Sequence, residues 1–513
     1  MQLRDLPRNA FKKTVKTKLY KKAYYRIADY VNDTALIEKL LRCCPDVGVI
    51  YLLMRPKKGL NCDDRLKDLF SKRVFDRVRE KNPESFKKVK VVNGEITEDG
   101  LGLSEEDREE LQRNCNIVFH SAACVRFDLK LKDAVNINTS GTLRVLTLAE
   151  SMKKLEAFVH LSTAYCRCEL DALEEKVYPA VHKPRRIIDI VNWMDDATLS
   201  HLEPKIIESE PNTYSYTKAI TEDLVDKYCG KFPIAIARPS IVVAAYKEPT
   251  PGWVDNLNGP TGLIIASGKG VVRSMLCEAS YTADAIPVDV VANACILIAY
   301  VTALDKPKET QSLQYFFFAG EQFVNEYPFT VALWYPGGDI HSYKLIHMIC
   351  VFFFHILPAY FVDALLFLLG KKTFMVNLQK RISHGMSVLT YYTTKEWHFR
   401  NTNYLGLRNR ISEKENDIFY TDLSVIKPSD FLRNYVLGAR EFVCKEDMST
   451  LPKARRIHKM RYIADRLVKI IFFGLLIWWL YNRSYIFTSS LDSFENAMQW
   501  MTPIGIVRAQ NEA

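Results

Sequence analysis

Residues 156–165 read Glu-Ala-Phe-Val-His-Leu-Ser-Thr-Ala-Tyr, an apolar, strand-like run that ends in two hydroxyl side chains, Ser162 and Thr163. A similar run upstream, residues 116–124, ends in small residues that let a ligand approach the backbone. From about residue 35 to residue 323, such runs alternate with longer amphipathic stretches. Strands that alternate with helices form an open parallel sheet, which binds its ligand at the carboxyl ends of the strands. The sequence therefore predicts an α/β, Rossmann-like domain.

Three further runs extend this predicted sheet. Residues 47–54 form a buried strand candidate that is followed by a basic turn, and residues 88–92 form another. Residues 233–243 form the third, but Pro239 interrupts it, and a regular interior strand does not tolerate proline. We expect this strand to end there, at a loop beside the ligand.

Tyr214 and Lys218 stand about fifty residues after the first run and four residues apart. An apolar pattern predicts a helix here that Gly230 ends, so phenol and ammonium share one face. A neighbouring positive charge lowers the pKa of a phenol, which makes it usable for proton transfer. The alternative is a half-buried helix with a snorkelling lysine. The strands that end in hydroxyls favour the catalytic interpretation.

The composition is that of a folded protein of two or three domains, with 513 residues, 25% charged and 48% hydrophobic. Its net charge of +10 suggests an anionic partner, namely a phosphorylated cofactor, an acidic lipid surface or nucleic acid. The 12 cysteines lack zinc-site spacing, so we predict no metal and reduced thiols. No secretory signal begins the chain. Instead, residues 1–34 form a basic arm, either solvated or bound to a membrane surface.

Two apolar segments follow the predicted sheet. Residues 345–370 are long enough to span a bilayer, but Pro358 and Asp363 interrupt them, so a buried helical hairpin or an acyl groove is an equal alternative. Residues 467–481 follow a basic cluster and carry Trp478 and Trp479, which fit an interfacial aromatic belt. This segment predicts a C-terminal membrane anchor, with a packed helix as the alternative. The cluster's position makes membrane binding a better interpretation than nucleic-acid binding, so we predict no nucleic-acid partner.

Taken together, these blocks resemble the fatty acyl-CoA reductases, a family of extended short-chain dehydrogenases, over nearly all of residues 35–481. The blocks that carry the resemblance, in order, are residues 38–46, 51–57, 119–127, 160–165, 211–218, 237–241, 251–260 and 286–289. The resemblance implies reduction of a long-chain fatty acyl-CoA to a primary alcohol by NADPH, through a bound aldehyde. It also implies a membrane-associated protein of the peroxisome or endoplasmic reticulum, with its catalytic domain in the cytosol.

The resemblance also assigns roles to residues. Tyr214 is implied as the proton donor, Lys218 as the group that holds the nicotinamide ribose, and Thr163, or less favourably Ser162, as the hydrogen-bond donor to the carbonyl oxygen. Arg55, assisted by Lys57 and Lys58, stands where a cation can meet the adenosine 2′-phosphate; a solvated basic turn is the alternative. The remaining implied cofactor contacts are Glu95 at adenine, Ala122 and Ala123 at ribose and phosphates, and Pro239 and Ser240 at nicotinamide.

One departure concerns the family's first strand and its glycine-rich turn, whose amides hold the cofactor pyrophosphate. Residues 24–37 occupy this position without a single glycine. We therefore expect the first strand and turn to be missing or altered, which leaves a catalytically impaired, lipid-binding relative as the alternative function. The expected division is a basic arm (1–34), an NADPH-binding reductase domain (35–323), a mostly helical C-terminal domain (324–460), and a membrane anchor with tail (461–513). The sequence predicts no particular oligomeric state or acyl chain length.

Overall fold

A computed structural model describes residues 23–27, 31–57, 59–305, 309–313, 316–317 and 321–500. Most of the predicted basic arm, Lys58 and the last 13 residues lie outside this part of the chain. So do residues 28–30, in the stretch that corresponds to the glycine-rich turn.

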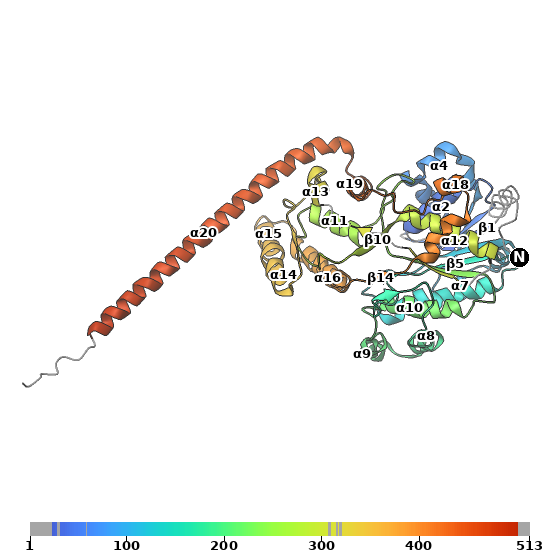
Figure 1. The fold of residues 1–513 in the computed structure, drawn as a ribbon, viewed down its shortest axis with the longest axis horizontal. Coiled ribbons are helices and arrows are strands. Elements are labelled where there is room, and N and C mark those ends of the chain that lie inside the picture. Colours follow the sequence, from blue (N-terminus) through green and yellow to red (C-terminus); the bar gives the residue numbers. More distant parts are fainter. Residues whose placement is uncertain are drawn as a thin grey trace, which may run out of the picture.

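A seven-stranded sheet forms the centre of the larger lobe (Figure 1), and every neighbouring pair in it is parallel. Its order is β11-β7-β5-β4-β1-β2-β3. The strand order switches between β1 and β4, because the strands after β1 are added first on one side (β2, β3) and then on the other (β4, β5, β7, β11). In sequence order the strands are β1 (Ala23–Ile27), β2 (Ile50–Met54), β3 (Val89–Asn93), β4 (Cys115–His120), β5 (Ala157–Leu161), β7 (Ile234–Pro239) and β11 (Glu309–Leu313). This is a Rossmann-like sheet, as the sequence predicted, and β7 ends at Pro239.

The prediction that the first strand is missing is wrong. Strand β1 lies in the middle of the sheet, where the Cα of Tyr25 is in register with Tyr51 of β2 and Val118 of β4. The sheet therefore begins inside the segment that was expected to be a basic arm. The segment lacks a long apolar run, so its strand conformation depends on pairing with both neighbours rather than on local composition.

Both faces of the sheet are covered, because alternate side chains of each strand point to opposite sides. Leu52 of β2 packs with helices α2 and α12 on one face, whereas Leu53 packs with α5, α7 and α10 on the other. Buried strands of this kind consist of nearly continuous apolar residues. The helices of this half are α2 (Val31–Cys43), α3 (Cys62–Ser71), α4 (Asp76–Lys81), α5 (Glu105–Asn114), α6 (Leu131–Ala134), α7 (Gly141–Glu150), α8 (Pro184–Trp193), α9 (Asp196–Ile206), α10 (Thr213–Asp226), α11 (Pro260–Gly268) and α12 (Val288–Asp305).

The C-terminal part is mostly helical, and much of it lies at the end of the molecule away from the sheet (Figure 1). Its helices are α13 (Glu321–Glu326), α14 (Lys344–Val351), the π-helical turn η5 (Phe352–Ile356), α15 (Leu357–Leu368), α16 (Met375–Thr393), α17 (Thr402–Gly406), α18 (Glu413–Ile418), α19 (Pro428–Gly438) and α20 (Leu451–Trp500). Small sheets accompany them, namely β12 (Phe316–Phe317) with β10 (Ala283–Pro287) and β8 (Ile241–Val243), β13 (Asp339–His341) with β9 (Ser274–Leu276), and β14 (His398–Phe399) with β6 (Ala172–Leu173).

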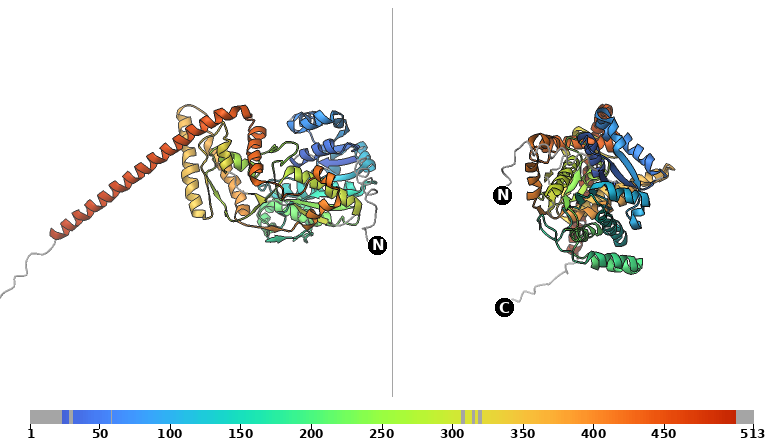
Figure 2. Two further views of the ribbon diagram at one scale, coloured as in Figure 1. Left: turned by 45° about the horizontal axis from the view of Figure 1, so that its top comes forward. Right: turned by 90° about the vertical axis from the view of Figure 1, so that its right-hand side faces the viewer.

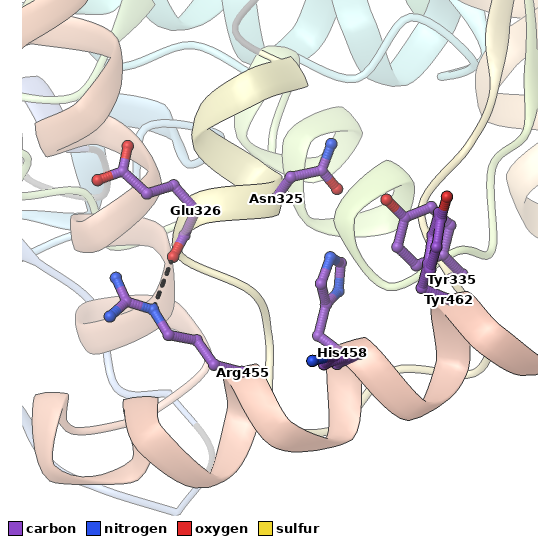
Figure 3. Close-up of a pocket in the computed structure, with 7 residues that line it drawn as sticks. Asn325, Glu326, Tyr335, Arg455, His458 and Tyr462 are labelled. Atoms are coloured by element: carbon purple, nitrogen blue, oxygen red, sulfur yellow. Dashed lines mark hydrogen bonds between the residues drawn. The ribbon is translucent and has the colours of Figure 1, made fainter.

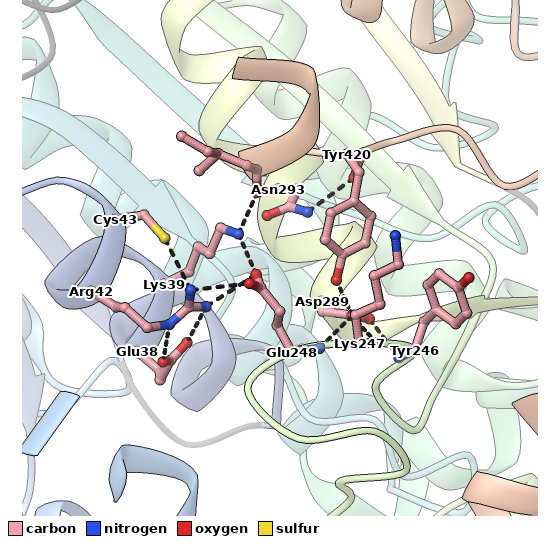
Figure 4. Close-up of polar contacts among 11 residues, drawn as sticks. Glu38, Lys39, Arg42, Cys43, Tyr246, Lys247, Glu248, Asp289, Asn293 and Tyr420 are labelled. Carbon is pink, nitrogen blue, oxygen red and sulfur yellow. Dashed lines mark hydrogen bonds and ion pairs between the residues drawn. The ribbon is translucent and has the colours of Figure 1, made fainter. Parts of the chain in front are cut away.

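A buried polar network joins the C-terminal part to the Rossmann-like part (Figure 4). Asp289, at the start of α12, accepts hydrogen bonds from the backbone N–H groups of Tyr246, Lys247 and Glu248, and from the Tyr420 hydroxyl. The Glu248 carboxylate in turn pairs with Lys39 and Arg42 of α2. A carboxylate that accepts several hydrogen bonds can remain charged inside a protein. These contacts fix the segment around residue 420 against α2 and α12.

Two described helices are long and apolar enough to cross a membrane. Val288–Asp305 is 83% buried and is the core helix α12, whereas Lys344–Leu368, which comprises α14, η5 and α15, is only 11% buried. The alternative that residues 345–370 form a buried hairpin is therefore wrong. Helix α20 extends from the body as a long rod (Figure 2), but among the described residues it does not meet the same criterion, so the C-terminal anchor stays a prediction.

Candidate active site

The predicted catalytic residues meet at the carboxyl end of β5. Ser162 and Thr163 directly follow this strand, and the Lys218 ammonium of α10 donates a 2.8 Å hydrogen bond to the backbone oxygen of Leu161, its last residue. The Tyr214 phenol, one turn earlier on α10, lies near the side chain of Thr163, which opposes the rise of its pKa. A phenol, a threonine hydroxyl and an ammonium thus converge where a parallel sheet binds its ligand.

The position of α10 is fixed at both ends of its catalytic turn. Its N-cap residue, Asn212, accepts a 2.9 Å hydrogen bond from the Ser215 N–H, which satisfies a free donor of the first turn. One turn after Lys218, Glu222 forms a bidentate ion pair with Arg238 of β7, at 2.9 and 2.6 Å. Both partners are buried, and Arg238 also donates to two backbone carbonyls. The pair is thus fully hydrogen-bonded and holds α10 against the sheet.

Burial is the largest effect on the pKa values of the site residues. It raises the pKa of the Tyr214 phenol, and the main opposing effect is the Thr163 hydrogen bond rather than the charge of Lys218 that the sequence suggested. Burial also lowers the pKa of Lys218 to about 8, although Glu222 opposes this shift. The phenol is therefore protonated at neutral pH and can donate a proton, while the ammonium remains mostly charged.

Two histidines lie in the strands beside Lys218. Their rings are 5.3 Å apart, at the paired positions His120 and His160 of β4 and β5. Burial, and then the charge of Lys218, lower the pKa of both imidazoles, that of His120 to about 3. Both rings are therefore neutral, and they surround the lysine without competing for its charge.

Two orphaned hydroxyls face the same strand ends. The Ser162 and Ser240 side chains are 5% exposed, and within the described part of the chain neither oxygen has a hydrogen-bond partner. Backbone hydrogen bonds from Ser162 to Ala237 and from Ala164 to Pro239 hold the ends of β5 and β7 together. A buried hydroxyl without a partner costs free energy, so a bound polar ligand would stabilise this arrangement.

A hollow of about 350 Å³ opens at the carboxyl ends of β2 and β3. Arg55 and Glu95 line it and form an ion pair with each other, with Arg55 half exposed. Gly94 forms part of its wall, where a Cβ atom would lie 2.6 Å from the Leu101 oxygen. Lys57 does not line the hollow, and its backbone pairs with Leu60. The hollow fits the adenosine end of a dinucleotide, and its cation is available to a phosphate.

The position between the adenosine hollow and the catalytic residues, where the pyrophosphate would lie, is less favourable for an anion. Ala122 and Ala123, which follow β4, are buried and small, as predicted. However, Ser121 donates a hydrogen bond to the carboxylate of Asp33, which is 1% exposed in the first turn of α2. A helix N-terminus attracts anions, and here a carboxylate of the chain lies where the pyrophosphate would bind. The described residues therefore fit a dinucleotide at its adenosine and nicotinamide ends, and Asp33 places a carboxylate between them.

Sequence reasoning missed Tyr392, which reaches the site from α16. Its hydroxyl accepts a 2.8 Å hydrogen bond from the Asn212 amide and lies 2.9 Å from the Ser215 hydroxyl. Its ring packs against Phe127, at 5.3 Å, and Phe127 packs against Tyr214, at 5.4 Å. No local pattern marks this residue, because its contacts with α10 lie 180 residues away in the sequence.

A second hollow, of about 360 Å³, lies between α13 and the start of α20 (Figure 3). The Tyr335 ring packs there in a tilted contact against His458, at 4.8 Å, and edge-on against Tyr462, at 5.2 Å, while Arg455 donates to the backbone oxygen of Glu326. None of the predicted catalytic or cofactor residues lines it. It is therefore separate from the site at β5.

Comparisons with known proteins agree with this geometry. The NAD-binding family model described as "Male sterility protein" matches residues 34–295, and a second model with this description, Sterile, matches residues 354–446. Mouse fatty acyl-CoA reductase 2 is 37% identical over 460 residues, 86% of this chain and 89% of its own length. Human fatty acyl-CoA reductase 1 is 37% identical over 456 residues, 86% and 88% of the two chains.

Solved structures show the same fold. The reductase domain of a nonribosomal peptide synthetase from Mycobacterium tuberculosis superposes with a TM-score of 0.54 at 16% identity, covering 86% of this chain and 96% of that one. The terminal R domain of the myxalamid pathway gives 0.53 at 17% identity, covering 82% and 91%. Sheet, site and matches together define a Rossmann-fold oxidoreductase that uses a nicotinamide cofactor. Within this class, the chain belongs to the fatty acyl-CoA reductase family.

Proposed function

We propose that this protein reduces long-chain fatty acyl-CoA to the primary fatty alcohol with NADPH, through an aldehyde that stays bound. The observation that supports it best is the convergence of Tyr214, Thr163 and Lys218 at the end of β5. Reduction of an acyl thioester to an alcohol requires two hydrides, and each turns a carbonyl oxygen into an oxyanion that needs stabilisation.

The chain's own residues would manage that oxyanion. Thr163, with Ser162 beside it, would donate a hydrogen bond to the carbonyl oxygen as charge develops there. Tyr214 would then transfer its proton to the alkoxide of the second reduction, since burial keeps its phenol protonated until an alkoxide accepts the proton. Lys218, anchored to Leu161, would hold the nicotinamide ribose and stabilise the phenolate that forms.

The cofactor would lie along the carboxyl edge of the sheet and would supply hydride when bound. Arg55 would leave Glu95 to bind the 2′-phosphate, which is the reason to prefer NADPH over NADH, and Glu95 would face adenine. Ala122 and Ala123 would allow close approach of the ribose and phosphates. Pro239 and the orphaned hydroxyl of Ser240 would border the nicotinamide.

The test is alcohol formation from a long-chain acyl-CoA and NADPH by the purified chain and by its Tyr214→Phe variant. We expect the variant to lose roughly 10²- to 10⁴-fold in rate, with its NADPH affinity nearly unchanged. Tyr216→Phe is the matched control, because this neighbouring phenol of α10 is directed at His182 instead. Retained turnover in Tyr214→Phe would assign the proton donor to another group.

A second candidate function follows from Asp33, the carboxylate at the pyrophosphate position. With cofactor binding weakened there, the chain would be an impaired relative that retains lipid or membrane binding. NADPH titration separates the two candidates. No detectable affinity, under conditions in which a relative with the glycine-rich turn binds, would favour the second.

We further propose that the protein is attached to a membrane through residues 461–513, with its catalytic domain in the cytosol. Seven basic residues against one acidic residue within the first 19 positions of α20 support this orientation, since positive charge stays on the cytosolic side. The peroxisome and the endoplasmic reticulum are the two candidate organelles. The division into a reductase domain (35–323) and a C-terminal domain (324–460) is proposed with it, its start extended to include β1.

A further inference from the structure

The helix formed by α14, η5 and α15 has its polarity reversed relative to a helix on a water-exposed surface. Its polar side chains face the protein: His347 bonds to the Ser274 hydroxyl at 2.8 Å, and His355 accepts a 2.7 Å hydrogen bond from the Arg273 N–H. Its opposite, outer face is apolar and exposed. The outer face includes Leu345, Ile349, Phe353, Tyr360, Phe361 and Leu368, each 47–78% exposed.

Charged groups on this helix do not oppose contact with lipid. Lys344 stands at its start, and Lys371 and Lys372 follow its end, all exposed, so cations flank the apolar face at both ends. The single acid, Asp363, is turned toward the next helix, where its carboxylate accepts hydrogen bonds from the N–H groups of Phe374, Met375 and Val376. Basic residues around an apolar stripe match a bilayer surface with anionic head groups.

Arg273 connects this helix to α20. Its guanidinium stacks over Phe354 at 5.3 Å and pairs with the buried carboxylate of Asp465 at 3.2 Å. Lys469, which pairs with Asp465, is the last charged residue before an apolar stretch of α20, and the large apolar side chains from Ile470 to Tyr481 are exposed. The outer face therefore lies beside the point at which α20 would enter a membrane. Figures 1 and 2 show α14 and α15 at the end of the molecule from which α20 projects.

From this arrangement we infer that the α14–α15 helix lies in the surface of the same bilayer that α20 enters, as a second membrane contact. The inference deepens the proposed membrane attachment and rests on it. The helix is held along its inner side by His347 and His355, so it lies on the membrane rather than crossing it. Burial of six large apolar side chains in lipid removes a surface that is larger than a water-soluble monomer usually exposes.

The test uses the purified full-length chain on phosphatidylcholine–phosphatidylserine vesicles that contain a lipid with a photoreactive acyl chain. After irradiation, mass spectrometry compares three tryptic peptides, residues 345–371, residues 470–483 and residues 187–205. The last carries Trp193, which is 82% exposed, on α8, and serves as the control; Figure 1 shows α8 beside α9 and apart from α14 and α15. We expect labelling of 345–371 at least about tenfold above this control.

The possible outcomes distinguish the second membrane contact from the proposed C-terminal anchor. Labelling of 470–483 without 345–371 would overturn the second contact and leave the C-terminal anchor. Labelling of 345–371 alone would support the second contact and contradict the anchor, whereas labelling of neither would overturn both. Crosslinks of 345–371 to another copy of the chain instead of lipid would also overturn the inference.

A double variant, Phe353→Glu with Phe361→Glu, provides a second measurement. Phe353 and Phe361 are 47% and 64% exposed, so the fold should persist, and thermal unfolding checks this. We expect vesicle affinity to fall roughly tenfold or more, because two large side chains can no longer enter lipid. Trp193→Glu is the matched control and should change affinity little; equal affinity of the double variant and this control would contradict the inference.

Discussion

Tyr392 shows how one side chain of the C-terminal part can set the geometry of a catalytic turn in the other part. Its hydroxyl bonds to Asn212 and Ser215, the residues on either side of Tyr214 at the start of α10. Phe127 fills the space between the two tyrosine rings. The direction of the Tyr214 phenol therefore depends on a residue from a different part of the chain.

We predict that Tyr392→Phe lowers the unfolding free energy by about 1 kcal/mol, the usual contribution of one or two lost hydrogen bonds. The turnover rate should fall roughly tenfold, because small displacements of a proton donor are costly, while NADPH affinity stays the same. Tyr391→Phe is the control, since that hydroxyl bonds to Cys168 and Lys395 and not to α10. Equal turnover in the two variants would contradict a positioning role for Tyr392.

Glu210 gives the protein a dependence of stability on pH. Burial, and then a hydrogen bond with Glu169, raise the pKa of Glu210 to about 9. The folded protein therefore holds a proton that the unfolded chain has lost above about pH 4.5. The stabilisation is complete below that pH and is lost as the pH rises to about 9.

We accordingly predict that the contribution of Glu210 to the unfolding free energy, taken as the difference between the wild-type protein and Glu210→Gln, falls between about pH 5 and pH 9. Burial raises the pKa of Asp284 to about 7 and contributes in the same direction over the lower part of this range. In Glu210→Gln, which keeps the hydrogen-bonding shape without a titrating proton, the slope should be smaller. Denaturant titrations at a series of pH values measure it, and an unchanged slope in the variant would show that Glu210 titrates normally.

At the scale of elements, the N-terminus of α2 differs from the glycine-rich turn that is typical of dinucleotide-binding sheets. A parallel sheet with a glycine-rich turn presents backbone N–H groups to the pyrophosphate, whereas here the Asp33 carboxylate occupies the first turn of the helix. We predict that Asp33→Gly tightens NADPH binding by about tenfold, since it removes both a like charge and the side-chain bulk. Isothermal titration calorimetry with NADPH measures the change.

Two comparisons isolate the cause. Asp33→Asn keeps the bulk and removes the charge, so it separates the electrostatic part of the effect from the steric part. Asp63→Gly makes the same change in the first turn of α3 and should leave affinity unaltered. Equal NADPH affinity of Asp33→Gly and Asp63→Gly would mean that Asp33 does not contact the cofactor.

The same region shows how far the sequence predicts the structure. Strands β2, β4, β5 and β7 were predicted because buried parallel strands are continuous apolar runs, and α10 was predicted from its helical periodicity. Strand β1 carries two tyrosines and an arginine in five residues and was missed, because its conformation depends on its neighbours. Tyr392 was missed for a related reason: contacts between distant segments leave no local pattern. Arg55, Glu95, Ser162 and Thr163 gather at one edge of the sheet because each follows a strand end, and α10 brings Tyr214 and Lys218 to the same edge.

At the scale of the whole molecule, the two apolar helices beside Arg273 should hold the protein on a membrane together. Removal of residues 467–513 leaves Asp465, so the Arg273 ion pair and the α14–α15 helix keep their positions. We expect this truncation to weaken vesicle binding strongly while some binding persists, which co-sedimentation with anionic vesicles measures.

Variants of the truncated chain identify which residues cause the vesicle binding that remains. The truncated chain with Phe353→Glu and Phe361→Glu should stay in the supernatant. The residual binding of the simple truncation should persist at high salt, because screening removes only the contribution of the flanking lysines. The truncation with Trp193→Glu is the control and should bind like the simple truncation. If the truncation alone already abolishes binding, α20 is the whole attachment, and the reversed polarity of the α14–α15 helix must serve something other than a bilayer. If both truncated variants bind equally, the residual contact lies elsewhere on the molecule.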